Sequence, residues 1–235
     1  MLGLLKLGKV CFGRSPDLRG LFLIPALKHQ IYFQSTIREM SKKALVIIAN
    51  GSEEMEAVIA IDVLRRGNCK KEECGDQVEV TVAGLEGPQP VECSRQVNIV
   101  PDVSLADVDS SKVYDVMVLP GGLKGSESFA KSPLVKSLLT EQYQNGRLVA
   151  AICAAPIALK AHNIAAGHTI TSYPAMKQQL QEGELYKYSE DKVVVDRNVV
   201  TSRGPGTAYD FGLKLVELLQ GAQAAQDIRK AMLVE

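Results

Sequence analysis

From residue 43 onward, short apolar runs alternate with segments that carry helix signals, and this alternation restricts the chain to few folds. A continuous apolar run bounded by turn residues is typical of a parallel strand that helices cover on both faces. Repeated strand–helix alternation predicts a single α/β domain with a doubly wound, mostly parallel sheet sandwiched by helices. The four clearest strands lie at 44–49, 78–83, 114–119 and 147–152.

The helix expected after the first strand is unusually apolar. Ser52 can cap its N-terminus, acidic residues in its first turn favour the helix dipole, and it should extend to about Arg66. Eight of the ten residues in 55–64 are apolar. A helix of this kind is covered on two sides, so we expect it to contact the sheet and a second body, such as another subunit.

Weaker patterns complete the expected order of elements. A polar loop at 67–77 carries too much charge to pack in a core. Residues 41–235 then read as one domain. The further elements are a peripheral pair of short strands within 91–100, helices near 133–144, from 155, at 175–181 and at 207–219, and strands at 186–195 and 198–202.

The first 40 residues differ from the rest of the chain in charge. They hold six basic and two acidic residues, a net charge of +4, although the whole chain has 27 of each. A basic segment poor in acidic residues is typical of a mitochondrial transit peptide. The alternative is a poorly ordered upstream extension, because Met40-Ser41-Lys42 reads like a natural start. We treat 1–40 as an N-terminal extension and candidate mitochondrial targeting segment.

The composition excludes several classes of protein. No apolar run reaches the roughly 18 residues of a membrane-spanning helix. The balanced charge gives no sign of nucleic-acid binding. The five cysteines are odd in number and form no CxxC pair, which favours reduced intracellular thiols over disulfides or a zinc site. We expect the protein in the cytoplasm and, through its N-terminal segment, in the mitochondrion.

Cys153 stands where open α/β sheets hold their ligands, outside the carboxyl end of a strand. It directly follows the strand 147–152 and precedes a helix start, among small alanines. A helix N-terminus lowers the pKa of a thiol and favours the nucleophilic thiolate. The alternative is a buried and inert thiol, the commonest state of a free cysteine.

Two further strand ends carry groups that a nucleophile needs. Gly121 and Gly122 leave backbone N–H groups that can stabilise an oxyanion, although a bare Pro-Gly-Gly turn is common. Glu56 has apolar helical neighbours, and burial would raise its pKa so that it can transfer protons. The alternative for Glu56 is an ordinary acid in a first helical turn. Arg203 either belongs to a tight turn or supplies a cation to the site.

Four motifs occur together over residues 42–234. They are the strand and acidic turn at 44–56, Val118-Leu-Pro-Gly-Gly122, Ala150-Ala-Ile-Cys-Ala-Ala-Pro156 and Thr201-Ser-Arg-Gly-Pro-Gly-Thr207. In this order they resemble the DJ-1 (Parkinson disease protein 7) family of the ThiJ/PfpI superfamily. The resemblance implies a flavodoxin-like sandwich, a homodimer, a location that includes the nucleus, and activity as a cofactor-free glyoxalase, protein deglycase or oxidative-stress sensor. It also implies roles for single residues: a nucleophile at Cys153, its carboxyl partner at Glu56, oxyanion glycines at Gly121 and Gly122, and site-lining residues at Arg95, Arg203 and Pro205.

The chain departs from this family pattern at two places. Tyr173 stands where many relatives have a histidine near the nucleophile. We therefore expect Glu56 to be the main acid and base, with Tyr173 against the substrate. The loop at 67–77 is longer than the resemblance suggests, and it follows the helix expected at the dimer interface.

These residues allow a reaction without a metal or nucleotide cofactor. A Cys153 thiolate would attack a small aldehyde such as methylglyoxal, with the oxyanion held by backbone N–H groups near Gly121, Gly122 and Ala154. Glu56 would move a proton between the two former carbonyl carbons, and hydrolysis would release lactate. Early glycation adducts of amines and thiols would react in the same way.

Two other functions compete with this reading. A non-catalytic redox sensor or a chaperone could use oxidation of the same cysteine. A class I glutamine amidotransferase shares the strand–cysteine–helix motif but also needs a histidine followed two residues later by glutamate. None of the three histidines has that neighbour, so this class is excluded.

Overall fold

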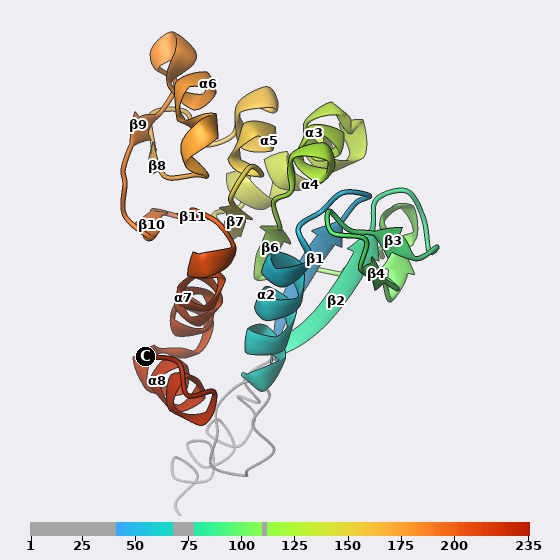
Figure 1. Cartoon of the computed structure of the whole chain (residues 1–235), viewed down its shortest axis with the longest axis vertical. Helices are drawn as coiled ribbons and strands as arrows, with labels where there is room; N and C mark the ends of the chain where they lie inside the picture. Colours follow the sequence, from blue (N-terminus) through green and yellow to red (C-terminus); the bar gives the residue numbers. More distant parts are fainter. Residues whose placement is uncertain (1–40, 68–77, 110–111) are drawn as a thin grey trace, which may run out of the picture. The chain divides into compact units, whose positions relative to one another are not determined.

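The computed structural model describes residues 41–67, 78–109 and 112–235 (Figure 1). The expected extension at 1–40 and most of the expected loop at 67–77 lie outside the described residues. The main sheet has seven strands: β1 (Lys42–Ile48), β2 (Val78–Gly84), β5 (Val103–Ser104), β6 (Val116–Leu119), β7 (Leu148–Ile152), β10 (Val193–Asp196) and β11 (Val199–Ser202).

The strand order in this sheet is β10-β11-β7-β6-β1-β2-β5. Every neighbouring pair is parallel except β10 with β11. The predicted mostly parallel, doubly wound sheet is therefore confirmed. Two small sheets lie outside it: an antiparallel pair, β3 (Val91–Glu92) with β4 (Asn98–Ile99), and a parallel pair, β8 (Thr169–Ile170) with β9 (Lys187–Tyr188).

Helices cover both faces of the sheet. The α-helices are α2 (Glu54–Arg66), α3 (Leu123–Lys131), α4 (Pro133–Gln144), α5 (Pro156–Ala161), α6 (Lys177–Gln181), α7 (Ala208–Gln220) and α8 (Ala222–Ala231). Single 3-10 turns lie at η2 (Leu105–Asp107), η3 (Pro174–Met176), η4 (Glu182–Glu184) and η5 (Pro205–Thr207). None of the helices in the described part of the chain is long and apolar enough to cross a lipid bilayer.

The core has two layers because side chains alternate along each strand. On β1, Val46 and Ile48 point into the layer formed with α2, α7 and α8. Leu45 and Ile47 point into the other layer, with residues of α3, α4 and α5. A strand that contributes to both layers is apolar at every position, which explains the continuous apolar run in the sequence.

The expected second cover of α2 lies within the same chain. Helix α7 runs beside α2 (Figure 1). The two helices pack closely, since a β-carbon added to Gly212 of α7 would lie 3.0 Å from the Val63 Cβ. Met55 and Val58 of α2 stay 52% and 48% exposed. Helix α7 thus covers part of the apolar surface of α2, and the first two turns keep an uncovered side.

The N-cap of α2 differs from the expectation. Glu53 is the cap, and its carboxylate accepts the Glu56 N–H at 2.8 Å. Ser52 instead accepts the Ala49 N–H at 3.0 Å and closes the turn after β1. The predicted cap, Ser52, was wrong by one position. The Ser52 hydroxyl is already bonded within the turn, so the Glu53 carboxylate caps the helix instead.

Other differences lie where charged residues interrupt a pattern. The strand expected at 186–195 is two strands, β9 and β10, in different sheets, separated by a turn in which Ser189 bonds Asp191 at 2.7 Å. The single helix expected near 133–144 is preceded by a second one, α3. Ser132 separates them and caps α4 through the Val135 N–H at 3.3 Å. The short β5 and the polar α8 were not predicted.

Candidate active site

Four neighbouring parallel strands bring the candidate residues to one edge of the sheet. The strands β11, β7, β6 and β1 are adjacent, so their carboxyl ends meet. The chain continues from β1 to β2 on one side and reaches β6 on the other, which makes the gap between β1 and β6 the topological switch point. Cys153 follows β7, Gly121 follows β6, Glu56 lies on α2 after β1, and Arg203 follows β11.

Cys153 occupies a strained elbow between β7 and α5. Its φ is +64°, a left-handed conformation that a non-glycine residue adopts only under constraint. The constraint comes from both neighbours in space. The Cys153 N–H donates to the Ser202 carbonyl at 3.0 Å, and the Cys153 carbonyl accepts the Tyr173 N–H at 2.8 Å. The elbow turns the side chain out of the strand, where it is 9% exposed.

The Glu56 carboxyl is fully buried beside this thiol. Its Oε2 accepts the Gly121 N–H at 2.7 Å. Its Oε1 is buried with no hydrogen-bond partner among the described residues, so this oxygen is free for a proton that moves to or from the site. Glu56 is therefore not an ordinary solvated acid of a first helical turn.

The two ionisable groups are coupled: the charge of Glu56 disfavours the Cys153 thiolate, whereas a hydrogen bond from Cys153 favours the Glu56 carboxylate. Burial is the main cause that raises the pKa of Glu56 to about 7. Burial, followed by the charge of Glu56, raises the pKa of Cys153 to about 12. Because the two groups are coupled, they share a proton instead of titrating independently. The thiolate arises when that shared proton lies on Glu56.

The predicted low pKa of Cys153 is wrong for a thiol beside an ionised Glu56. Helix α5 has only six residues, so the dipole behind the elbow is weak. Backbone N–H groups of Gly122 and Ala154 do lower the pKa of Cys153, but burial outweighs them. The sequence shows the helix start and not the burial of the thiol.

The backbone N–H groups at this edge of the sheet serve two different side chains, Cys153 and Glu56. The N–H groups of Gly122 and Ala154 face the Cys153 sulfur, as an oxyanion site for an adduct on this sulfur requires. The Gly121 N–H differs from the expectation, because it already donates to Glu56. Gly121 thus orients the carboxyl, and Gly122 and Ala154 are the donors left for an oxyanion.

Gly121 must be glycine for steric reasons. A β-carbon there would lie 2.5 Å from the Cys153 Cβ and 2.6 Å from Glu56 Oε2. We expect Gly121→Ala to lower the free energy of unfolding by about 1–3 kcal/mol. By displacing the thiol from the carboxyl it should also lower turnover about 100-fold. Chemical denaturation and turnover per folded molecule measure the two effects.

Gly206→Ala is the matched control for Gly121→Ala. Gly206 lies in η5 near the same edge, and a β-carbon there would meet nothing within 4 Å. If both variants lose activity equally, the effect does not come from the contact with Cys153 and Glu56.

The remaining predicted residues lie at different distances from the pair. The Tyr173 N–H donates to the Cys153 carbonyl, and the residue is 47% exposed. Arg203 and Pro205 follow β11 beside Gly204, where a β-carbon would lie 4.0 Å from Glu56 Oε1. Their segment therefore borders the site.

Arg95 is not brought to the pair within this chain. Its N–H donates to the Glu54 carboxylate at 2.8 Å, and its guanidinium is exposed and donates to the Ser94 carbonyl at 3.1 Å. Among the described residues, no contact joins Arg95 to Cys153 or Glu56. Ser202 lies in one of the four motifs, but the sequence assigned it no role at the site, because the group that accepts the Cys153 N–H is its backbone carbonyl.

The fold and the site together define the class. It is an α/β protein with an open, mostly parallel sheet, a cysteine on a left-handed elbow after one strand, and a buried glutamate beside that cysteine. The chain belongs to the DJ-1/PfpI family, whose model matches residues 42–218.

Relatives support this membership over nearly the whole described part. The chain is 54% identical over 196 residues to protein dj-1beta of Drosophila melanogaster, across 83% of this chain and 98% of the relative. It is 38% identical over 192 residues to a Caenorhabditis elegans protein named glutathione-independent glyoxalase DJR-1.2, across 81% and 96%. The crystal structure of Drosophila melanogaster DJ-1beta superposes with a TM-score of 0.77 at 53% identity, across 83% of this chain and 100% of that one.

Proposed function

We propose that the protein is a cofactor-free glyoxalase that converts methylglyoxal to lactate and also releases early glycation adducts of this aldehyde. One observation carries the proposal. A buried carboxyl whose pKa is raised to about 7 lies against a thiol, and two backbone N–H groups face the sulfur. The Caenorhabditis elegans relative that is named a glutathione-independent glyoxalase adds support.

The first step joins the aldehyde to Cys153. The sulfur attacks the aldehyde carbon, Glu56 accepts the thiol proton, and a hemithioacetal forms. The N–H groups of Gly122 and Ala154 stabilise the oxyanion until Glu56 passes the proton to it, which leaves Glu56 ionised for the next step. The elbow favours this step because it holds the sulfur out of the strand at the open edge of the sheet.

The second step moves hydrogen within the adduct. Glu56 removes the proton from the former aldehyde carbon and returns a proton to the neighbouring carbon. The first carbon is oxidised to a thioester and the second is reduced to an alcohol, so no external electron acceptor is needed. Water then cleaves the thioester, which releases lactate and restores the thiol.

The deciding experiment is a turnover assay with the full chain. Lactate formed from methylglyoxal should exceed the enzyme concentration many times over. The competing redox-sensor function predicts at most one adduct per cysteine, because a sensor has no step that restores the thiol. A stoichiometric yield of lactate would therefore reject the glyoxalase proposal.

We also propose that the protein forms a homodimer through the first turns of α2. Met55 and Val58 lie on one side of the helix, and α7 leaves them exposed. Replacing Met55 with lysine should shift the protein from dimer to monomer in sedimentation, because two copies of the charge would meet across a twofold axis. Leu134→Lys, at a similarly exposed apolar position on α4, is the control. A monomeric wild type at micromolar concentration would contradict the proposal.

A further inference from the structure

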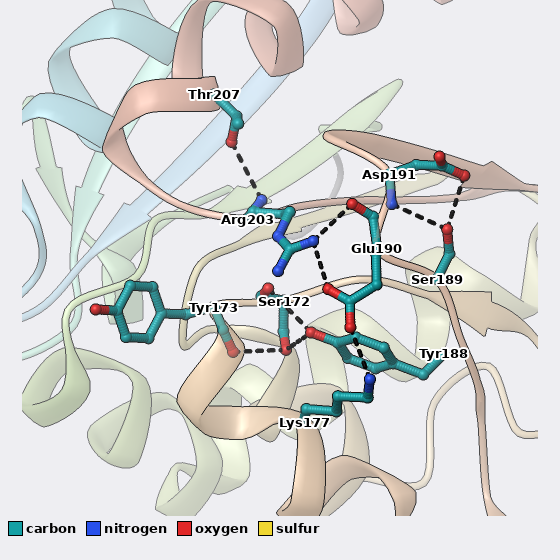
Figure 2. A network of polar contacts seen from close by, with 9 residues as sticks. All are labelled: Ser172, Tyr173, Lys177, Tyr188, Ser189, Glu190, Asp191, Arg203 and Thr207. Atoms are coloured by element: carbon teal, nitrogen blue, oxygen red, sulfur yellow. Dashed lines mark hydrogen bonds and ion pairs between the residues drawn. The ribbon is translucent and has the colours of Figure 1, made fainter.

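Glu190 lies at the centre of a polar network that includes Lys177 and Arg203 (Figure 2). It belongs to the segment between β9 and β10. Its carboxylate accepts Lys177 Nζ at 2.6 Å and pairs with Arg203 Nη1 at 2.5 Å. Its backbone carbonyl accepts the same Nη1 at 2.6 Å. One residue therefore joins two segments that are distant in sequence.

The two joined segments are those that hold Cys153. Lys177 begins α6, one turn after Tyr173, whose N–H donates to the Cys153 carbonyl. Arg203 directly follows Ser202, whose carbonyl accepts the Cys153 N–H. A change in the separation of these segments would act on the Cys153 peptide from both sides.

Different contacts fix the inner and outer ends of the two segments. At the inner end, the Thr171 N–H donates to Thr201 Oγ1 at 2.9 Å in a buried position. At the outer end, the described residues offer only Glu190 as a bridge between Lys177 and Arg203. Arg203 at the outer end precedes Gly204, where a β-carbon would lie 4.0 Å from Glu56 Oε1, so Glu190 fixes a part of the frame that borders the site.

The balance of charge at the outer end of the two segments also depends on Glu190. Hydrogen bonds from Lys177 and Arg203 lower the pKa of Glu190, so the carboxylate is ionised at neutral pH. It holds the Arg203 side chain at 22% exposure, next to Gly204 and the edge of the site. Without the carboxylate, two unneutralised cations would repel each other and separate the segments.

We propose that Glu190 is a positioning residue for the Cys153 site, because it fixes the separation of the Tyr173 and Ser202 segments. It acts through Lys177 and Arg203 and not by touching the thiol. Its effect on turnover rests on the proposed glyoxalase function. Its effect on the accessibility of Cys153 does not.

The test compares Glu190→Gln with a matched control, Glu141→Gln. Glu141 pairs with Arg147 at 3.1 Å, at the other end of β7. The arginines of the two pairs are equally exposed, 22% each, and both glutamates are largely exposed. An exposed ion pair contributes little to stability, so neither variant should unfold. Any difference between the two variants in kcat/KM or in the alkylation rate of Cys153 then comes from where the two ion pairs lie relative to the site.

We expect Glu190→Gln to lower kcat/KM for methylglyoxal about tenfold, mainly through a higher KM, because the segment of Arg203 and Gly204 that borders the site is displaced. Alkylation of Cys153 by iodoacetamide should become about threefold faster, because the elbow opens more often. Glu190→Asp, which keeps the charge, should recover part of both effects. In the wild type, about 500 mM salt should move both values toward those of Glu190→Gln, since salt screens exposed charges.

Three results would overturn the proposal. The first is an equal and small change in Glu190→Gln and Glu141→Gln. The second is an unchanged alkylation rate in Glu190→Gln. The third is a Glu190→Asp variant no better than Glu190→Gln. A wild type without turnover would reject the glyoxalase function alone, and the alkylation rates would still decide the role of Glu190.

Discussion

Cys153→Ala is expected to abolish methylglyoxal turnover, with a loss of about 10⁴-fold or more in kcat. The substitution removes the only sulfur that faces both Glu56 and the free N–H groups of Gly122 and Ala154 among the described residues. It keeps the β-carbon and leaves the two backbone hydrogen bonds of the elbow in place. The fold should therefore survive, with a change in unfolding free energy of about 1 kcal/mol. Lactate formation and thermal unfolding measure the two quantities.

Cys93→Ala is the control for this variant. Cys93 is also a buried free thiol, 3% exposed, and burial raises its pKa to about 11. It lies on the turn after β3, and its thiol bonds only weakly, to the Val91 carbonyl at 3.9 Å. Turnover should be unchanged in this variant. If Cys153→Ala keeps more than a tenth of wild-type turnover, the nucleophile is another residue.

Glu56→Gln is expected to give the second largest loss, about 10²–10⁴-fold in kcat. The amide can still accept the Gly121 N–H, but it cannot take a proton from the thiol or move one between substrate carbons. In the wild type, turnover should rise as pH increases through about 7, because Glu56 accepts a proton only when ionised. The rise near pH 7 should be absent from the pH profile of the variant.

The same substitution should not weaken the fold. Because the pKa of Glu56 is raised in the folded protein, its contribution to stability is present at low pH and is lost as pH rises through about 7. Near pH 8 the neutral amide should therefore make the protein at least as stable as the wild type. Glu54→Gln is the control, since Glu54 is a buried glutamate of α2 that bonds Ser94 and Arg95 instead of the site. Full turnover in Glu56→Gln would reassign the base, with Tyr173 as the next candidate.

Much of the architecture could be predicted from the sequence because its signals are local. The run at 44–49 is apolar at successive positions since β1 contributes to both core layers. The turn after each strand carries its own glycine or small residues. The resemblance of four motifs indicated candidate site residues, of which the structure brings Cys153, Glu56 and Gly121 together but not Arg95. The family comparison confirms the resemblance itself.

The sequence by itself determined the order of strands and helices, the position of Cys153 after a strand, and the presence of glutamates near the start of α2. Only the tertiary structure decided how far Cys153 and Glu56 are buried and in which direction their pKa values shift. Burial by residues far along the chain raises the pKa of Cys153 and of Glu56, whereas the helix start in the sequence predicts a low thiol pKa. Glu190 likewise joins Lys177 to Arg203, which no local pattern indicates. Apolar periodicity depends on near neighbours in sequence, whereas desolvation and charge pairing depend on neighbours in space.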